Sequence, residues 1–145
     1  MMFDLRKANE NDINLLINYK LLTIYDYAEN LSNDEINKIQ EYVNNSVLED
    51  LDKYKVIMVS GNDVGSLLVT SYENGVLLDE IYLEEKYRCS GIGTSIIKNI
   101  LNEHSVVYLW VYKKNVKAIN LYEKLGFIKF KETETRYFMK YEKEQ

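Results

Sequence analysis

The stretch from Asp79 to Leu101, DEIYLEEKYRCSGIGTSIIKNIL, joins an apolar run to an amphipathic one through a glycine-containing turn. This turn holds Arg88, Gly91 and Gly93, although the chain of 145 residues has only six glycines. Helix starts carry unpaired N–H groups and a partial positive charge, and glycine lets a phosphate approach the backbone closely. The segment up to Thr94 therefore suggests a pyrophosphate cradle, although a plain strand-to-helix turn would have the same pattern.

Two common phosphate-binding motifs do not fit this turn. A P-loop needs a lysine directly after its second glycine, whereas Gly93 is followed by Thr94 and the next lysine is Lys98. A dinucleotide-binding turn needs a third glycine, where this chain has Ile96. The following apolar run ends in Tyr-Lys-Lys at 112–114, without the acidic residue that would bind a ribose.

A second motif lies further along, in NVKAINLYEKLGF from Asn115 to Phe127. There an asparagine opens a helix and Tyr122 follows seven residues later, before Leu-Gly-Phe. Arg88-x-x-Gly91-x-Gly93 resembles the coenzyme A loop of the GNAT family, the Gcn5-related N-acetyltransferases, and the second motif resembles a later motif of that family. The resemblance is detailed over residues 76–130, and the order of elements agrees over the whole chain.

The resemblance implies that acetyl-CoA is the cosubstrate and that no metal is needed. In the family, the strands matching 76–83 and 106–112 are parallel and splay apart, and the pantetheine arm enters the gap as an added strand would. The expected cofactor-binding residues are Ile81, Leu83, Arg88, Cys89, Ser90, Gly91, Ile92, Gly93, Thr94 and Asn115.

The resemblance also implies a direct transfer, in which an uncharged amine attacks the thioester. Tyr122 matches the usual general acid, which supplies a proton to the leaving thiolate. Glu80 is the predicted base, acting directly or through a water, and Asp79 is the second choice. A carboxylate on a central strand is costly without partners or a function, so Glu80 could instead bind the substrate cation or a neighbouring backbone group. A cysteine acyl intermediate at Cys89 is not expected.

Composition excludes several other classes. The chain carries 23 Asp and Glu against 18 Lys and Arg, a net charge of −5, which argues against a nucleic-acid binder. One cysteine and one histidine exclude an internal disulfide and a metal site rich in these residues. No apolar run approaches the roughly 20 residues that span a bilayer. The beginning of the chain lacks a secretory signal pattern, so we expect a cytoplasmic protein without a membrane partner.

Periodicity and turn signals predict the elements that position these motifs. Asn9 or Asn11 caps a first helix with Ile13 and Ile24 on its apolar face, and Ser32 with Glu35 forms a capping box. Strands are expected at 3–8, 55–60, 64–70, 76–83, 106–112, 127–132 and 135–141, with a hairpin turn at 61–63. Further helices are expected at 32–42, 91–103 and 115–125, and Gly126 is expected to end the last of them in a left-handed conformation. Residues 44–54 stay unassigned.

These elements predict one domain over residues 1–145, of α/β (α+β) class. Its GNAT-like sheet is mixed and mostly antiparallel, with a splayed central parallel pair and helices on both faces. The C-terminal strands could pair between two copies, which makes a homodimer possible.

The predicted function is acetyl transfer from acetyl-CoA to a primary amine. The acceptor would lie over the two N-terminal helices and a loop at 44–54, and the acidic, tyrosine-rich segment 24–50 favours a small cationic amine. A protein N-terminus or a lysine side chain is an alternative acceptor. A non-catalytic acyl-CoA-binding module is the alternative of another class, but it would need neither Tyr122 nor Glu80. A phosphate-binding structural domain would not explain residues 115–127.

Overall fold

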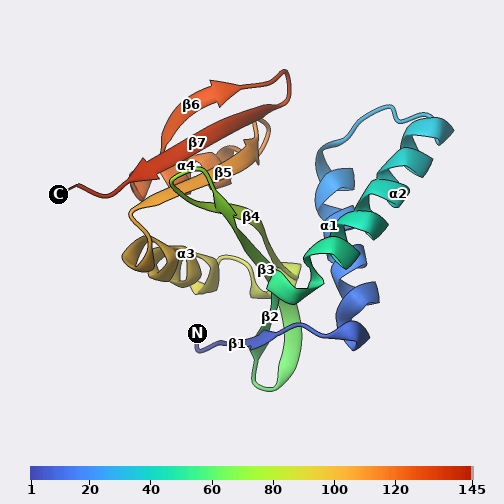
Figure 1. Cartoon of the computed structure of the whole chain (residues 1–145), viewed down its shortest axis with the longest axis horizontal. Helices are drawn as coiled ribbons and strands as arrows, with labels where there is room; N and C mark the ends of the chain where they lie inside the picture. Colours follow the sequence, from blue (N-terminus) through green and yellow to red (C-terminus); the bar gives the residue numbers. More distant parts are fainter. Residues whose placement is uncertain (145) are drawn as a thin grey trace. The chain divides into compact units, whose positions relative to one another are not determined.

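A computed structural model describes residues 1–144 (Figure 1). By its internal packing the chain divides into two compact units. The first, here the N-terminal unit, comprises Met2–Leu68 and Glu80–Lys86. The second, here the C-terminal unit, comprises Met1, Val69–Asp79 and the chain from Tyr87 onward. Because strands β3 (Asn62–Tyr72) and β4 (Gly75–Leu83) each contribute to both units, the two units share the backbone of one hairpin.

In the N-terminal unit, side chains cap the start of the second helix and of a 3-10 turn that precedes the first. Asn9 rather than Asn11 caps the 3-10 turn at Glu10–Asp12, which leads into α1 (Ile13–Tyr27). The N-cap of α1 itself is Asp12, which makes no side-chain cap hydrogen bond. Ser32 and Glu35 form the predicted capping box at the start of α2 (Asn33–Asp50). Both caps satisfy N–H groups that a helix start leaves unpaired.

The second helix is longer than the sequence analysis expected. It continues to Asp50 and into a 3-10 turn at Leu51–Lys53, so the expected acceptor loop at 44–54 is wrong. Val43 and Val47, four residues apart, both lie in the core with no exposed surface. This i, i+4 spacing is the helical signal that extends α2 past residue 42.

The strands of the N-terminal unit are antiparallel. Strand β1 (Asp4–Lys7) pairs with β2 (Tyr54–Val59), and β2 pairs with β3. The β2–β3 turn consists of Ser60 and Gly61, with φ of 51° and 80°, instead of the three residues 61–63 expected from the sequence. Two successive positive φ angles fit a two-residue turn whose twist matches that of the flanking strands.

The C-terminal unit contains the parallel pair. Strand β4 pairs in parallel with β5 (Val106–Tyr112) from Val76↔Val107 to Leu78↔Leu109, and both strands continue beyond these pairs. Strand β7 (Arg136–Glu142) pairs antiparallel with β5 and with β6 (Ile128–Glu132). The strand order β1-β2-β3-β4-β5-β7-β6 makes a seven-stranded, mostly antiparallel sheet, as predicted.

Two further helices follow the predicted bounds closely. Helix α3 (Ile92–Glu103) buries one face of isoleucine and leucine, and α4 (Val116–Lys124) ends before Gly126. Gly126 has φ of 105°, which confirms the left-handed stop. None of the helices within residues 1–144 combines the length and hydrophobicity that crossing a bilayer demands.

Gly65 is expected to be the least replaceable glycine of the N-terminal unit. A Cβ there would lie 2.0 Å from the carbonyl oxygen of Tyr82. Gly65→Ala should therefore lower the free energy of unfolding by about 3 kcal/mol, measured by urea denaturation. Gly61→Ala is the control: its Cβ meets open space, so only the positive φ costs stability, about 1 kcal/mol. A smaller loss for Gly65→Ala than for Gly61→Ala would contradict this packing.

Candidate active site

The predicted cradle is a loop that ends directly at the start of α3. After a 3-10 turn at Glu85–Tyr87, Cys89 and Gly91 adopt positive φ angles of 59° and 90°. Such alternation turns successive backbone N–H groups toward one side, a geometry that binds anions. The N-cap of α3 is Gly91, which has no side chain to cap the helix, and the first turn of α3 contains no acidic residue. Among the described residues, a Cβ on Gly91 would meet no atom within 4 Å. These N–H groups have the surroundings that a phosphate needs.

The Ser90 hydroxyl stabilises this loop from within. It donates a hydrogen bond of 2.6 Å to the carbonyl oxygen of Tyr87. While this bond is kept, the hydroxyl proton is not free for a phosphate, so Ser90 would contribute through its backbone N–H. This hydrogen bond closes the turn from Tyr87 to Ser90, in which Cys89 has its positive φ.

One contact to the cradle was missed by sequence reasoning. The Lys117 ammonium donates to the Cys89 sulfur at 3.0 Å, which joins the cradle to the first turn of α4. This hydrogen bond raises the pKa of Lys117 above its usual value, so the ammonium stays charged. The two residues are 28 positions apart, and no spacing rule connects them. The available hint was a lysine in a helix's first turn, where acidic residues are favoured.

Helix α4 holds the second motif in a defined orientation. The Asn115 side chain accepts the N–H of Ala118 at 3.2 Å and so caps the helix, as predicted. Tyr122 lies almost two turns later and therefore on the same helix face. Its ring packs 5.7 Å from that of Phe127, and its carbonyl oxygen accepts the N–H of Phe127 at 3.0 Å. The turn at Gly126 thus holds the backbone of Tyr122, and with it the start of the side chain, in a defined position.

Glu80, on β4 in the N-terminal unit, is 9% exposed and held by several partners. The Tyr54 hydroxyl donates to its Oε2 at 2.6 Å and the Ser66 hydroxyl to its Oε1 at 3.3 Å. The Lys20 ammonium lies 4.0 Å from Oε2. This network explains how a carboxylate is tolerated on a buried strand position. Asp79, the second-choice base, is exposed.

The end of β4 carries another group that the sequence analysis did not identify. The Tyr19 hydroxyl donates to Oε2 of Glu84 at 2.5 Å, and its ring stacks on Tyr82 with centroids 4.6 Å apart. Burial, followed by the bond to Glu84, raises the pKa of Tyr19, so this phenol stays protonated. Ile81 and Leu83, expected to present backbone to a cofactor, are half-buried on the same strand. Alternation along β4 puts residues 80 and 82 on one face, and Glu84, the first residue after the strand, continues this alternation, which was readable from the sequence.

The structure therefore gathers the predicted residues in two groups. The cradle from Arg88 to Thr94, Asn115 and Tyr122 belong to the C-terminal unit, where Lys117 joins two of their elements. Glu80, Ile81 and Leu83 belong to the N-terminal unit.

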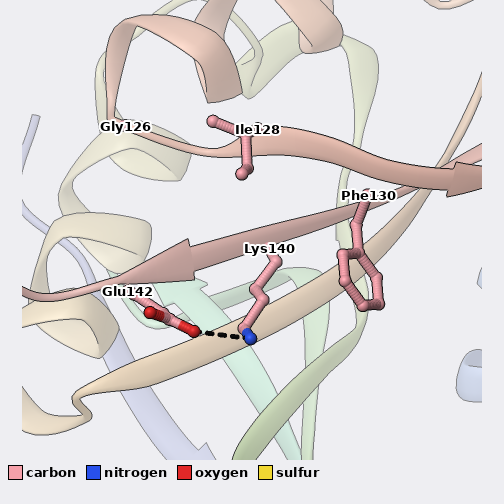
Figure 2. Close-up of a pocket in the computed structure, with 5 residues that line it drawn as sticks. All are labelled: Gly126, Ile128, Phe130, Lys140 and Glu142. Atoms are coloured by element: carbon pink, nitrogen blue, oxygen red, sulfur yellow. Dashed lines mark ion pairs between the residues drawn. The ribbon is translucent and has the colours of Figure 1, made fainter.

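A surface hollow elsewhere in the C-terminal unit contains none of these residues (Figure 2). It is lined by Gly126, Ile128, Phe130, Lys140 and Glu142, on β6, β7 and the turn before β6. The Lys140 ammonium pairs with the Glu142 carboxylate at 2.5 Å. This hollow is not the candidate active site.

Comparison with known proteins assigns the family. The sequence model described as an acetyltransferase (GNAT) domain matches residues 50–129, which include the cradle, Asn115 and Tyr122. The chain belongs to the GNAT acetyltransferase domain family, and the resemblance stated from the two motifs is confirmed.

Two curated relatives match part of the chain. One is the thialysine N-epsilon-acetyltransferase of Mus musculus, 38% identical over 87 residues, which are 50% of this chain and 51% of that protein. The other is the spermine/spermidine N(1)-acetyltransferase of Bacillus subtilis (strain 168), 31% identical over 62 residues, 38% of this chain and 41% of that protein. The matched regions thus span about half of these relatives or less.

A solved structure shows the same fold over nearly the whole chain. It is the PaiA N-acetyltransferase from Thermoplasma acidophilum in complex with coenzyme A, with a TM-score of 0.78 and 19% sequence identity. The similarity covers 98% of this chain and 99% of that one.

Removing the Glu80 side chain should destabilise the N-terminal unit. Glu80→Ala takes an acceptor from the buried Tyr54 hydroxyl, which should lower the free energy of unfolding by about 2 kcal/mol. Glu80→Gln keeps an acceptor oxygen for Tyr54 and should lose about half as much. Urea denaturation of both variants measures the difference. Equal and negligible losses would contradict a network organised by Glu80.

Proposed function

We propose that this chain is an acetyl-CoA-dependent N-acetyltransferase that acetylates a primary amine, with a small cationic amine as the favoured acceptor. The observation that carries the proposal is the open start of α3 behind Arg88-x-x-Gly91-x-Gly93. There, positive φ angles at Cys89 and Gly91 and the absence of a side-chain cap leave backbone N–H groups for an anion. Because the chain belongs to the GNAT family, we take this anion to be the pyrophosphate of coenzyme A.

The residues present fit coenzyme A. N–H groups between Cys89 and Thr94 would hold its pyrophosphate, and a side chain at Gly91 would intrude on the open space there. Backbone groups of Ile81 and Leu83 would pair with the pantetheine arm, and Asn115 would contact it from the start of α4. When bound, acetyl-CoA supplies an activated acetyl thioester.

Tyr122 is assigned the general acid in this proposal. Its phenol would donate a proton to the departing sulfur. The packing of its ring against Phe127 and the bond from Phe127 N–H to its carbonyl oxygen orient the side chain for this task.

Glu80 is assigned the base that accepts the proton of the incoming ammonium, through a water. Its carboxylate is already oriented by Tyr54 and Ser66. Those bonds make Glu80 a fixed acceptor, so a relayed proton would arrive at a defined position.

Charge supports a cationic acceptor. The N-terminal unit carries 15 Asp and Glu against 7 Lys and Arg, whereas the C-terminal unit carries 8 against 11. A negative unit attracts an ammonium, and a positive one attracts an anionic cosubstrate. The names of the two curated relatives, which state spermine, spermidine and thialysine as substrates, agree with this class of acceptor.

Coenzyme A should stabilise the chain against heating, and filling the cradle should abolish the effect. At a ligand concentration of about 100 times Kd, binding adds about 2.7 kcal/mol, or roughly 8 °C in Tm. Gly91→Trp should show no such shift in differential scanning fluorimetry. Gly61→Trp is the matched control, because Gly61 also has a positive φ and open surroundings but lies in the β2–β3 turn.

The control should start from a lowered Tm and keep the full coenzyme A shift. The proposal is contradicted if the wild type shows no shift near millimolar coenzyme A, or if Gly91→Trp keeps it.

Tyr122→Phe tests the general acid. The variant keeps the ring that packs on Phe127 and removes the hydroxyl, so kcat should fall by about 10²- to 10⁴-fold while the coenzyme A shift in Tm is unchanged. The assay follows thiol release from acetyl-CoA with spermidine, thialysine and a lysine-containing peptide as acceptors. Tyr141→Phe is the control, because Tyr141 also packs on Phe127, at 5.7 Å.

Tyr141→Phe should keep the wild-type rate. An unchanged kcat in Tyr122→Phe would remove the acid role from this residue. If thiol release occurs with the peptide but not with spermidine or thialysine, the acceptor is a polypeptide and not a small amine.

A further inference from the structure

We propose that Lys117 is a cofactor-positioning residue, whose ammonium leaves the Cys89 sulfur to pair with the pyrophosphate in the cradle. Lys117 would then make binding of the cosubstrate depend on the pyrophosphate. This inference rests on the proposed function, because it takes coenzyme A as the ligand. It adds a charged side chain from α4 to the backbone N–H groups of the cradle.

The position of the ammonium is the first argument. Lys117 Nζ lies 3.0 Å from the sulfur of Cys89, the first residue of the cradle with a positive φ. The side chain is exposed, and a lysine's four-carbon stem is flexible. A thiol is a weak acceptor, whereas a phosphate oxygen forms a charge-assisted bond. A small movement therefore exchanges a weak partner for a strong one.

The charges at helix starts are the second argument. Helix α2 and the 3-10 turn before α1 have acidic residues in their first turns, as the positive end of a helix favours. Helices α1, α3 and α4 have none, and of the four helices in residues 1–144 only α4 has a lysine, Lys117, in its first turn. A cation there is unfavourable unless an anion offsets it. The start of α4 thus keeps a positive field of the kind that acidic residues offset at α2 and at the 3-10 turn before α1.

The conformation of Cys89 is the third argument. A φ of 59° suits glycine better than a residue with a Cβ. Unlike a glycine, Cys89 has a side chain that accepts a hydrogen bond from the Lys117 ammonium beside the cradle. Cys89 therefore holds Lys117 near the position that the phosphate would occupy.

Truncated ligands separate the pyrophosphate from the other parts of coenzyme A. Isothermal titration calorimetry would give Kd for coenzyme A, 3′-dephospho-coenzyme A and pantetheine, with displacement titrations where binding is weak. Lys117→Met should weaken both pyrophosphate-containing ligands by about tenfold and leave pantetheine unchanged. Lys117→Arg should keep most of the affinity. Lys124→Met, at the other end of α4, is the control and should bind all three ligands normally.

Three results would overturn the proposal. Equal losses for all three ligands would give Lys117 a purely structural role, a loss for coenzyme A alone would place it on the 3′-phosphate, and no loss would remove it from the site. In each of these cases the wild type still binds coenzyme A, so the proposed function survives. If the wild type binds none of the ligands, the proposed function itself fails and this inference fails with it.

Discussion

Backbone N–H groups without a capping side chain at the start of α3 are the feature on which the proposed chemistry depends. A helix start leaves such groups unpaired, and the N-terminal unit satisfies its own with Asn9 and with the Ser32–Glu35 box. At Gly91 the chain forgoes this, because a left-handed residue without a side chain turns the N–H groups outward and covers none of them. The internal bond from Ser90 to Tyr87 and the contact from Lys117 to Cys89 hold the loop in this shape. In the proposed function, the pyrophosphate of coenzyme A would accept hydrogen bonds from these N–H groups.

The N-terminal unit has a different task, which is to accommodate carboxylates on and directly after a strand that packs into a core. Glu80 is surrounded by hydroxyls and a lysine, and Glu84 receives the hydroxyl of the buried Tyr19. These bonds reduce the cost of burial and fix the direction of each carboxylate. Glu80 is on β4, and Glu84 directly follows Leu83, the last residue of that strand. Both carboxylates thus lie within a five-residue stretch of the N-terminal unit.

Much of this could be predicted because the signals are local. The caps at Ser32 and Asn115, the stop at Gly126 and the apolar β5 each depend on residues a few positions apart, and all are confirmed. Helix α2 was cut short because its polar second half hides the spacing of Val43 and Val47. The β2–β3 turn was shifted because Ser60 takes a left-handed conformation usually reserved for glycine or asparagine. The partners of Glu80, Glu84 and Cys89 lie 14 to 65 residues away, and only tertiary packing brings them together.

The account's central claim is that coenzyme A binds through the N–H groups at the start of α3. A titration of ¹⁵N-labelled protein with coenzyme A, followed by amide chemical shifts, tests this most directly. The account predicts that the largest shifts fall on Gly91, Ile92, Gly93 and Thr94, with smaller ones at the start of α4. Saturable binding that leaves these amides unmoved while others shift would contradict it.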